Sequence, residues 1–310
     1  MEYEKLGRTA TKVSRIGFGC WAIGGHGYGR VDDGQSIAAI RKALDLGINL
    51  FDTADVYGFG HSEEVISKAL GNRINDVVVA TKFGIRWDHS GRTYKDCSVG
   101  HLKRALEGSL RRLQTDCIPL YQLHWHDGVT LLSDVFEALC RFREEGKIRH
   151  IGISNTPSSR FTDSAGAAEV VSSQLEFSIA SQDSLDDLAS FRESHGIATL
   201  AYGVLARGLL SGKYNQDSRF GENDTRGRDP GFREKMERSK GIVEGLKRVS
   251  AKYGKTLSQV ATRWVLENPC VSCALIGIKV EQQVLENIGA VGWHMEKDDR
   301  DYLGSLGQSE

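Results

Sequence analysis

The sequence has no excess of charge of either sign, which limits the partners to be expected. It carries 40 Lys and Arg residues against 41 Asp and Glu residues in a chain of 310. A protein that binds nucleic acid or an acidic membrane through its electrostatic field usually has a marked positive excess. The composition gives no reason to expect either partner, so a small molecule is the expected ligand.

Long apolar runs and a dense set of cysteines are also missing. The first residues, MEYEKLGRTATKV, lack the apolar core of a signal peptide, and no run approaches membrane-spanning length. We therefore expect a cytoplasmic protein. The six cysteines are scattered and do not indicate a disulfide framework. Cys270 and Cys273 form an isolated CxxC, which we interpret as small buried residues rather than as a redox or metal site.

Strand-like apolar runs alternate with segments of helical period along the chain. Strands are expected at 16–25, 48–52, 77–82, 118–124, 148–154, 170–176, 197–202 and 273–277. Helices are expected at 35–46, 63–70, 98–113, 132–146, 158–167, 184–195, 239–253, 257–267 and 280–290, with a tail helix ending near 306. Eight strand–helix units without a linker predict an α/β fold, a single (β/α)8 TIM barrel domain over residues 1–310 with extra helices near the C-terminus.

Two segments lie outside this repeat. Tyr3 to Leu6 and Lys12 to Ile16 flank a polar turn and predict a β-hairpin that plugs one end of the barrel. Residues 211–238 are polar and glycine-rich, with no period, and predict a long loop of the kind that forms lids.

Closely spaced glycines follow the first strand and match the pattern GxGxxA at Gly17, Gly19 and Ala22. A Rossmann dinucleotide site needs a helix to begin at this turn. Here the chain continues through GGHGYGRVDDG before any helical period begins. We therefore reject the Rossmann interpretation.

Polar side chains with compatible chemistry follow three consecutive strands. Asp52 and Tyr57 follow the strand that begins at Ile48, Lys82 ends the next strand, and His124 ends the one after it. In a closed parallel barrel the carboxyl ends of neighbouring strands are adjacent, so these side chains are expected to meet.

The four residues together suit the reduction of a carbonyl. The Lys82 ammonium is expected to lower the pKa of the Tyr57 phenol, and Asp52 to hold that ammonium in place. His124 is placed to donate a hydrogen bond to the oxygen on which negative charge grows. None of these side chains supplies a hydride, so a nicotinamide cofactor is the expected complement.

Other interpretations of these residues stay open. Each of the four, taken alone, is more often a packing, capping or surface residue. A barrel hydrolase would pair Asp52 with a second carboxylate, for which Glu176 is the candidate. That alternative leaves Lys82 and Tyr57 without a role.

The chain resembles the aldo-keto reductase superfamily, and its bacterial stress-protein type in particular. The motifs that carry the resemblance are FDTADVYGFGHSEE, ATKFG, LYQLHWHD, IGISN, AYGVLARGLLSGKY and ALIGIKVEQQVLENIGA. By that resemblance Tyr57 is the proton donor, Lys82 and Asp52 tune it, and His124 orients the substrate carbonyl. The chain has Pro119, His126 and Gly203-Val204 where family members usually carry an acidic residue, a proline and Ser-Pro.

The resemblance further implies that NADPH (NADP+) lies extended across the strand ends. The implied cofactor contacts are Gly19, Trp21, Asp52, Ser154, Asn155, Gln174, Tyr202, Gly203, Leu205, Arg207, Gly277, Lys279, Gln283 and Asn287. Among them, Ser154, Asn155 and Gln174 would hold the nicotinamide carboxamide. A cation at Lys279 suits a 2′-phosphate, which favours NADPH over NADH.

Three tryptophans follow strands of the expected barrel and predict an apolar wall around the substrate. They are Trp21, Trp87 and Trp125, for which packing at the bases of loops is the alternative. The expected function is NADPH-dependent reduction of an aldehyde or ketone. The alternative is a regulatory subunit of the same fold that binds cofactor with little turnover. The sequence makes no prediction of an oligomeric state.

Overall fold

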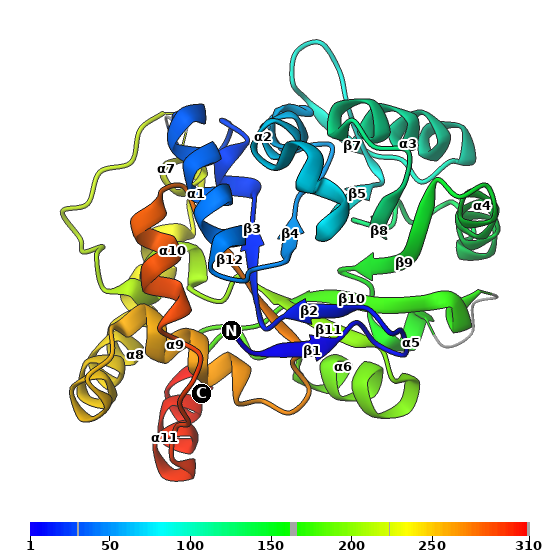
Figure 1. The fold of residues 1–310 in the computed structure, drawn as a ribbon. Helices are drawn as coiled ribbons and strands as arrows, with labels where there is room; N and C mark the ends of the chain where they lie inside the picture. Colours follow the sequence, from blue (N-terminus) through cyan, green and yellow to red (C-terminus); the bar gives the residue numbers. More distant parts are fainter. Residues whose placement is uncertain (30, 162–165, 223, 309–310) are drawn as a thin grey trace.

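The computed structural model describes residues 1–29, 31–161, 166–222 and 224–308. In these residues eight parallel strands close into a barrel in the order β10-β11-β12-β3-β4-β5-β8-β9 (Figure 1). The strands are β3 (Ile16–Gly19), β4 (Leu50–Asp52), β5 (Val78–Phe83), β8 (Ile118–Leu123), β9 (Ile148–Ser154), β10 (Val170–Glu176), β11 (Ala198–Tyr202) and β12 (Cys273–Gly277). The predicted TIM barrel is confirmed.

The barrel register brings polar strand ends side by side. Paired positions on neighbouring strands include Gly19 with Asp52, Lys82 with Gln122, and Ser154 with Gln174. Side chains alternate between the two faces of a strand, so residues two apart face the same way. Leu50 of β4 and Ala80 of β5 face the interior, and Asp52 and Lys82 therefore face it too, one layer nearer the mouth.

Helices surround the barrel (Figure 1). They are α1 (Asp33–Asp45), α2 (His61–Leu70), α3 (Val99–Leu113), α4 (Leu132–Glu144), α5 (Ser158–Phe161), α6 (Leu185–Ala189), α7 (Thr225–Arg228), α8 (Phe232–Tyr253), α9 (Leu257–Leu266), α10 (Glu281–Ile288) and α11 (Lys297–Gly307). Short 3-10 and π turns complete them: η1 (Trp21–Ile23), η2 (Gly71–Asp76), η3 (Ala167–Glu169), η4 (Ser190–Ser194) and η5 (Ala206–Ser211). Side-chain caps begin several of these helices, as where Asp32 accepts from the Gln35 N–H at 2.8 Å. Among the described residues, none of the helices combines the length and the apolar composition that a membrane span requires.

The predicted amino-terminal hairpin is confirmed as β1 (Tyr3–Lys5) and β2 (Lys12–Ser14). Figure 1 shows it across one end of the barrel. Leu6 and Val13 are fully buried and pack with interior residues such as Leu120 of β8. The hairpin therefore closes the amino-terminal end of the barrel, and the opposite end remains for the polar strand ends.

The prediction of a loop through 211–238 is wrong in its second half. Helix α7 spans Thr225–Arg228, and α8 begins at Phe232 rather than near 239. Phe232 and Met236 are buried against Leu209 in a small separate apolar cluster. The sequence shows only these two apolar residues among many charged ones, so its helical period was too weak to detect. Packing against Leu209 stabilises the first turn of α8.

A second hairpin was not predicted. Strands β6 (Ile85–Trp87) and β7 (Thr93–Lys95) pair antiparallel directly after β5. The Asp88 carboxylate holds their turn by accepting from the Ser90 and Arg92 N–H groups at 2.9 and 3.1 Å. The strands are short and mostly exposed, so they lack the apolar alternation that reveals a strand. Of the helix expected at 158–167, residues 162–165 lie outside the described residues.

The interpretation of the CxxC pair as buried residues is confirmed. Cys270 and Cys273 are both buried, and both are free thiols. Cys273 begins β12 and faces the apolar interior of the barrel together with Leu275.

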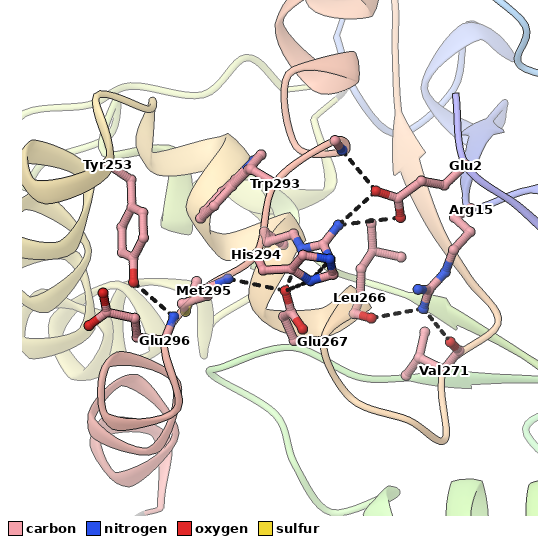
Figure 2. Close-up of polar contacts among 12 residues, drawn as sticks. Glu2, Arg15, Tyr253, Leu266, Glu267, Val271, Trp293, His294, Met295 and Glu296 are labelled. Carbon is pink, nitrogen blue, oxygen red and sulfur yellow. Dashed lines mark hydrogen bonds and ion pairs between the residues drawn. The ribbon is translucent and has the colours of Figure 1, made fainter.

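Polar contacts around Glu2 and Glu267 connect the first residues of the chain to the segment before α11 (Figure 2). The Arg263 side chain of α9 is 2% exposed and donates to Glu267 at 2.7 Å and to Glu2 at 3.1 Å. Glu267 also accepts from the Met295 N–H at 3.1 Å, and Glu2 from the Gly292 N–H at 2.8 Å. The segment before α11 is thus fixed to the amino-terminal strand through charge-assisted hydrogen bonds.

We expect Arg263→Met to lower the free energy of unfolding by about 3 kcal/mol, because two carboxylates lose their buried partner. Urea unfolding measures the loss. Arg238→Met removes an exposed pair with Glu234 and should cost less than about 1 kcal/mol. Equal costs for the two variants would contradict this account of the Arg263 contacts.

Candidate functional site

The polar strand ends meet around one buried ion pair. The Lys82 ammonium of β5 lies 2.7 Å from Oδ2 of Asp52 on β4, and both residues are buried. The same ammonium donates to the Thr53 carbonyl at 2.8 Å and lies 3.4 Å from the Tyr57 hydroxyl. Three oxygens therefore occupy the three donors of the ammonium, and the phenol is one of them.

The other oxygen of Asp52 is held by two amides. Nε2 of Gln174 on β10 donates to Oδ1 at 2.7 Å, and Nε2 of Gln122 on β8 donates to it at 3.3 Å. Gln122 is fully buried and was missed from the sequence. It is uncharged and lies inside an apolar-looking strand, and only its even spacing from His124 indicates that it faces the same way.

The loop after β4 places the Tyr57 phenol by a close backbone approach. Gly58 has a φ of 61°, and a Cβ there would lie 1.8 Å from the Gly24 carbonyl oxygen. Only glycine fits that contact and that conformation. The Tyr57 ring stacks on Trp21 with centroids 6.0 Å apart, and the His124 ring meets it edge-on at 5.8 Å.

The pKa of Tyr57 moves in the direction opposite to the one expected from the sequence. Burial raises it well above the ordinary phenol value, and the Asp52 carboxylate raises it further. The expectation considered the Lys82 ammonium alone, whereas Asp52 balances that charge at 2.7 Å. The phenol is therefore fully protonated at neutral pH and able to donate its proton.

His124 is neutral for related reasons. It is buried at the end of β8, and burial followed by the Lys82 charge lowers its pKa well below the ordinary value. Its Nδ1 atom is buried and has no hydrogen-bond partner in the described part of the chain. A neutral imidazole of this kind donates through one nitrogen without adding a charge to the site.

A second polar group lies beside the first, at the ends of β9, β10 and β11. Asn155 has a φ of 51° and donates to the His124 carbonyl at 3.1 Å. It also accepts from the Tyr202 hydroxyl at 2.8 Å. Ser154 donates to the Gln174 carbonyl at 3.0 Å. The structure therefore brings these residues at the ends of β9, β10 and β11 together, next to the ion pair.

Arg207 connects the segment after β11 to α7 and to the residue that follows α7. Gly203 and Arg207 both have left-handed φ angles, of 71° and 58°. The Arg207 guanidinium donates to Asp229 at 2.6 Å and to Thr225 at 2.9 Å. Its Nε is buried and finds no partner among the described residues. Leu205 lies between Gly203 and Arg207 in the sequence, is partly buried, and packs against the main core.

The last group lies where β12 leads into α10. Gly277 pairs with Gly19, so the ends of β12 and β3 are adjacent. The Lys279 N–H donates to the Gln283 side chain at 2.7 Å, and its ammonium donates to the Tyr28 carbonyl. Asn287 lies buried one turn further along α10.

A second cation, the Arg226 guanidinium, lies near Lys279. Arg226 of α7 pairs with Asp224 at 2.5 Å and lies over the Tyr28 ring at 5.3 Å. Burial lowers the pKa of Lys279, and the Arg226 charge lowers it further. An anion bound between these two cations would relieve their repulsion.

The three tryptophans each contact a different aromatic ring or cation. Trp21 stacks on Tyr57 and is 42% exposed. Trp87 contacts the Phe59 ring at 5.7 Å instead, and Trp125 lies under the Lys95 ammonium at 4.7 Å. Of the three, Trp21 is the one that stacks on a residue of the ion-pair group.

Comparison with known proteins gives a consistent result over nearly the whole chain. Residues 15–307 match the aldo/keto reductase family. The aldo-keto reductase YhdN of Bacillus subtilis is 34% identical over 311 residues, covering 99% of this chain and 93% of YhdN.

Solved structures agree with this match. The glycerol dehydrogenase AKR11B4 of Gluconobacter oxydans superimposes with a TM-score of 0.87 at 34% identity, covering 98% of this chain and 94% of its own. An aldo-keto reductase of Klebsiella pneumoniae in complex with NADP and acetate superimposes with a TM-score of 0.74 at 27% identity, with coverage of 96% and 92%.

Proposed function

The chain belongs to the aldo/keto reductase family, and from that premise we propose that it reduces an aldehyde or ketone to an alcohol with NADPH as the hydride donor. The observation that carries the proposal is the contact of the Tyr57 hydroxyl, 3.4 Å away, with an ammonium that is itself paired to Asp52. A protonated phenol next to a buried ion pair is the arrangement of a general acid. Under this proposal the single domain spans residues 1–310 and is of the bacterial stress-protein type.

The side chains of this site have separate tasks in the proposed reaction. His124, neutral and buried, donates a hydrogen bond that orients the carbonyl oxygen and favours its negative charge. Tyr57 gives its proton to that oxygen as the charge develops. Lys82 then stabilises the phenolate left behind, because its ammonium already lies 3.4 Å from the hydroxyl. Asp52 keeps the ammonium aimed throughout.

The residues present fit a bound NADPH, which would supply the hydride. Asn155 and Gln174 offer amide groups of the kind that recognise a carboxamide, and the Tyr202 ring lies beside them for stacking. The unpartnered Arg207 Nε suits a phosphate oxygen. The two neighbouring cations, Lys279 and Arg226, suit the additional phosphate that distinguishes NADPH from NADH.

We expect Lys279→Ala to weaken NADPH binding about ten-fold and to leave NADH binding unchanged, because only NADPH carries the 2′-phosphate. Fluorescence titration with each cofactor gives the two dissociation constants. Lys240→Ala, which removes an exposed pair on α8, should change neither. An equal loss for both cofactors would show that Lys279 does not read the 2′-phosphate.

A panel of carbonyl compounds tests the proposed function. NADPH consumption is followed with aldoses, aromatic aldehydes and cyclic ketones as substrates. We expect turnover with at least one class, lost when Tyr57 is replaced. Tight NADPH binding with no turnover across the panel would instead support the regulatory-subunit alternative.

A further inference from the structure

We propose that Gln122 is a positioning residue, which fixes the Asp52 carboxylate so that Lys82 stays aimed at the Tyr57 hydroxyl. The inference rests on the proposed function and deepens it. Gln122 lies on β8 two residues before His124, facing the same way, and its Nε2 donates to Asp52 Oδ1 at 3.3 Å. Lys82 holds the other carboxylate oxygen at 2.7 Å. Together with the Gln174 bond to Oδ1 at 2.7 Å, these contacts define the orientation of the carboxylate.

Burying the Gln122 amide in the barrel interior makes an unfavourable contribution to the free energy of folding. Gln122 is fully buried, and its Oε1 has no hydrogen-bond partner among the described residues. An apolar side chain, such as that of Leu120 two residues earlier, would avoid that unpaired oxygen. Gly152 of β9 leaves the space, because a Cβ there would lie 2.8 Å from Gln122 Cγ. The hydrogen bond to Asp52 is the contact that accounts for an amide at this buried position.

Gln122 also differs from the second amide at the same oxygen. Gln174 donates to Oδ1 at 2.7 Å, but the proposed function assigns it to the carboxamide of the cofactor as well. Among the described residues, the Gln122 side chain is hydrogen-bonded to Asp52 alone. It therefore acts through Asp52 rather than on the substrate.

The charges around this amide come from few elements. Asp52 on β4 and Lys82 on β5 are charged groups beside it, with Tyr57 and His124 at the mouth, and the buried Asp55 carboxyl interacts electrostatically with Lys82 and Tyr57. The thiols Cys20 and Cys273 interact electrostatically with Asp52 from the side of β3 and β12. The facing residues of β9 and β10, Gly152, Ser172 and Gln174, do not titrate.

Two variants of similar size separate a positioning role from a packing role. Gln122→Met keeps the volume and removes the donor; we expect kcat to fall about ten-fold with KM within about two-fold. Gln122→Glu keeps the shape but donates only while its carboxyl is protonated. Burial and the Asp52 charge raise the pKa of that carboxyl above the ordinary ~4.3.

The pH dependence of Gln122→Glu is the decisive readout. Its kcat should approach the wild-type value at low pH and fall about ten-fold or more below it as the introduced carboxyl ionises and repels Asp52. Because the folded-state pKa is raised, the stabilising contribution is present at low pH and lost as pH rises through that pKa. The Tm of Gln122→Glu should therefore drop relative to wild type as pH rises, and that of Gln122→Met should keep a constant offset.

Thr262→Val serves as the control, since the buried Thr262 hydroxyl lies on α9, outside the site, and also has no hydrogen-bond partner within the described ranges. It should leave kcat and its pH profile unchanged. Two results together would overturn the inference. Gln122→Met would lower Tm but not kcat, and the kcat of Gln122→Glu divided by the wild-type kcat would not vary with pH. If the wild-type protein reduced no carbonyl, the proposed function would be contradicted instead. The pH dependence of the Tm would still measure the contribution of the bond from Gln122 to Asp52.

Discussion

Replacing Tyr57 by Phe should lower kcat by about 10³-fold, the range a general acid contributes. The change removes one hydroxyl and leaves the ring, which stacks on Trp21 and meets His124 edge-on. The surroundings of the cofactor are therefore kept, and the dissociation constant for NADPH should stay within about two-fold, because the lost hydroxyl acts only in the transition state. Steady-state kinetics and fluorescence titration measure the two quantities on the same preparation.

Tyr121→Phe is the matched control for this prediction. Tyr121 is fully buried on β8, its hydroxyl has no partner in the described part of the chain, and its ring stacks on Phe83. We expect it to keep wild-type kcat. A loss of NADPH binding in Tyr57→Phe, or an equal drop in kcat for both variants, would contradict the role of Tyr57 as the acid.

Lys82→Met should damage both activity and stability. Without the ammonium, the phenolate left by proton transfer loses its neighbouring cation, and removing a donor of this kind typically lowers kcat by 10²-fold or more, about 3 kcal/mol. The buried Asp52 carboxylate also loses its ion-pair partner. Breaking a buried pair from one side costs about 3–5 kcal/mol in the free energy of unfolding. Kinetics and urea unfolding measure the two losses.

The double variant Asp52→Asn, Lys82→Met separates these two effects. With both charges removed, no uncompensated charge stays buried, so stability should return by about 2 kcal/mol or more relative to Lys82→Met. The activity should not return, because the cation beside Tyr57 is still absent. If the double variant regained activity together with stability, Lys82 would be a structural residue only.

The four residues at the centre of the site were predictable because each is chemically distinctive where a strand ends. Asp52, Lys82 and His124 interrupt or end apolar runs, and the barrel topology then requires that they meet. Gln122 was not predictable in the same way. Its contact with Asp52 depends on the register between β8 and its neighbours, which a single sequence does not contain.

The direction of the Tyr57 pKa shift shows a second limit of sequence reasoning. The identity of the neighbours was right, but the sign depends on how deeply the phenol is buried and on which carboxylate already balances Lys82. Helix α8 shows a third, since its first turn is stabilised by a contact between Phe232 and Leu209 that is distant in sequence. Both features depend on tertiary packing and not on local pattern.

Transfer of deuterium tests the central claim most directly. NADPH carrying deuterium at the transferable position of its nicotinamide is incubated with the carbonyl panel, and the alcohols are analysed by mass spectrometry. The account predicts an alcohol with one deuterium on the former carbonyl carbon, formed by the wild-type protein and about 10³-fold more slowly by Tyr57→Phe. Bound NADPH with no deuterium in any product would contradict it.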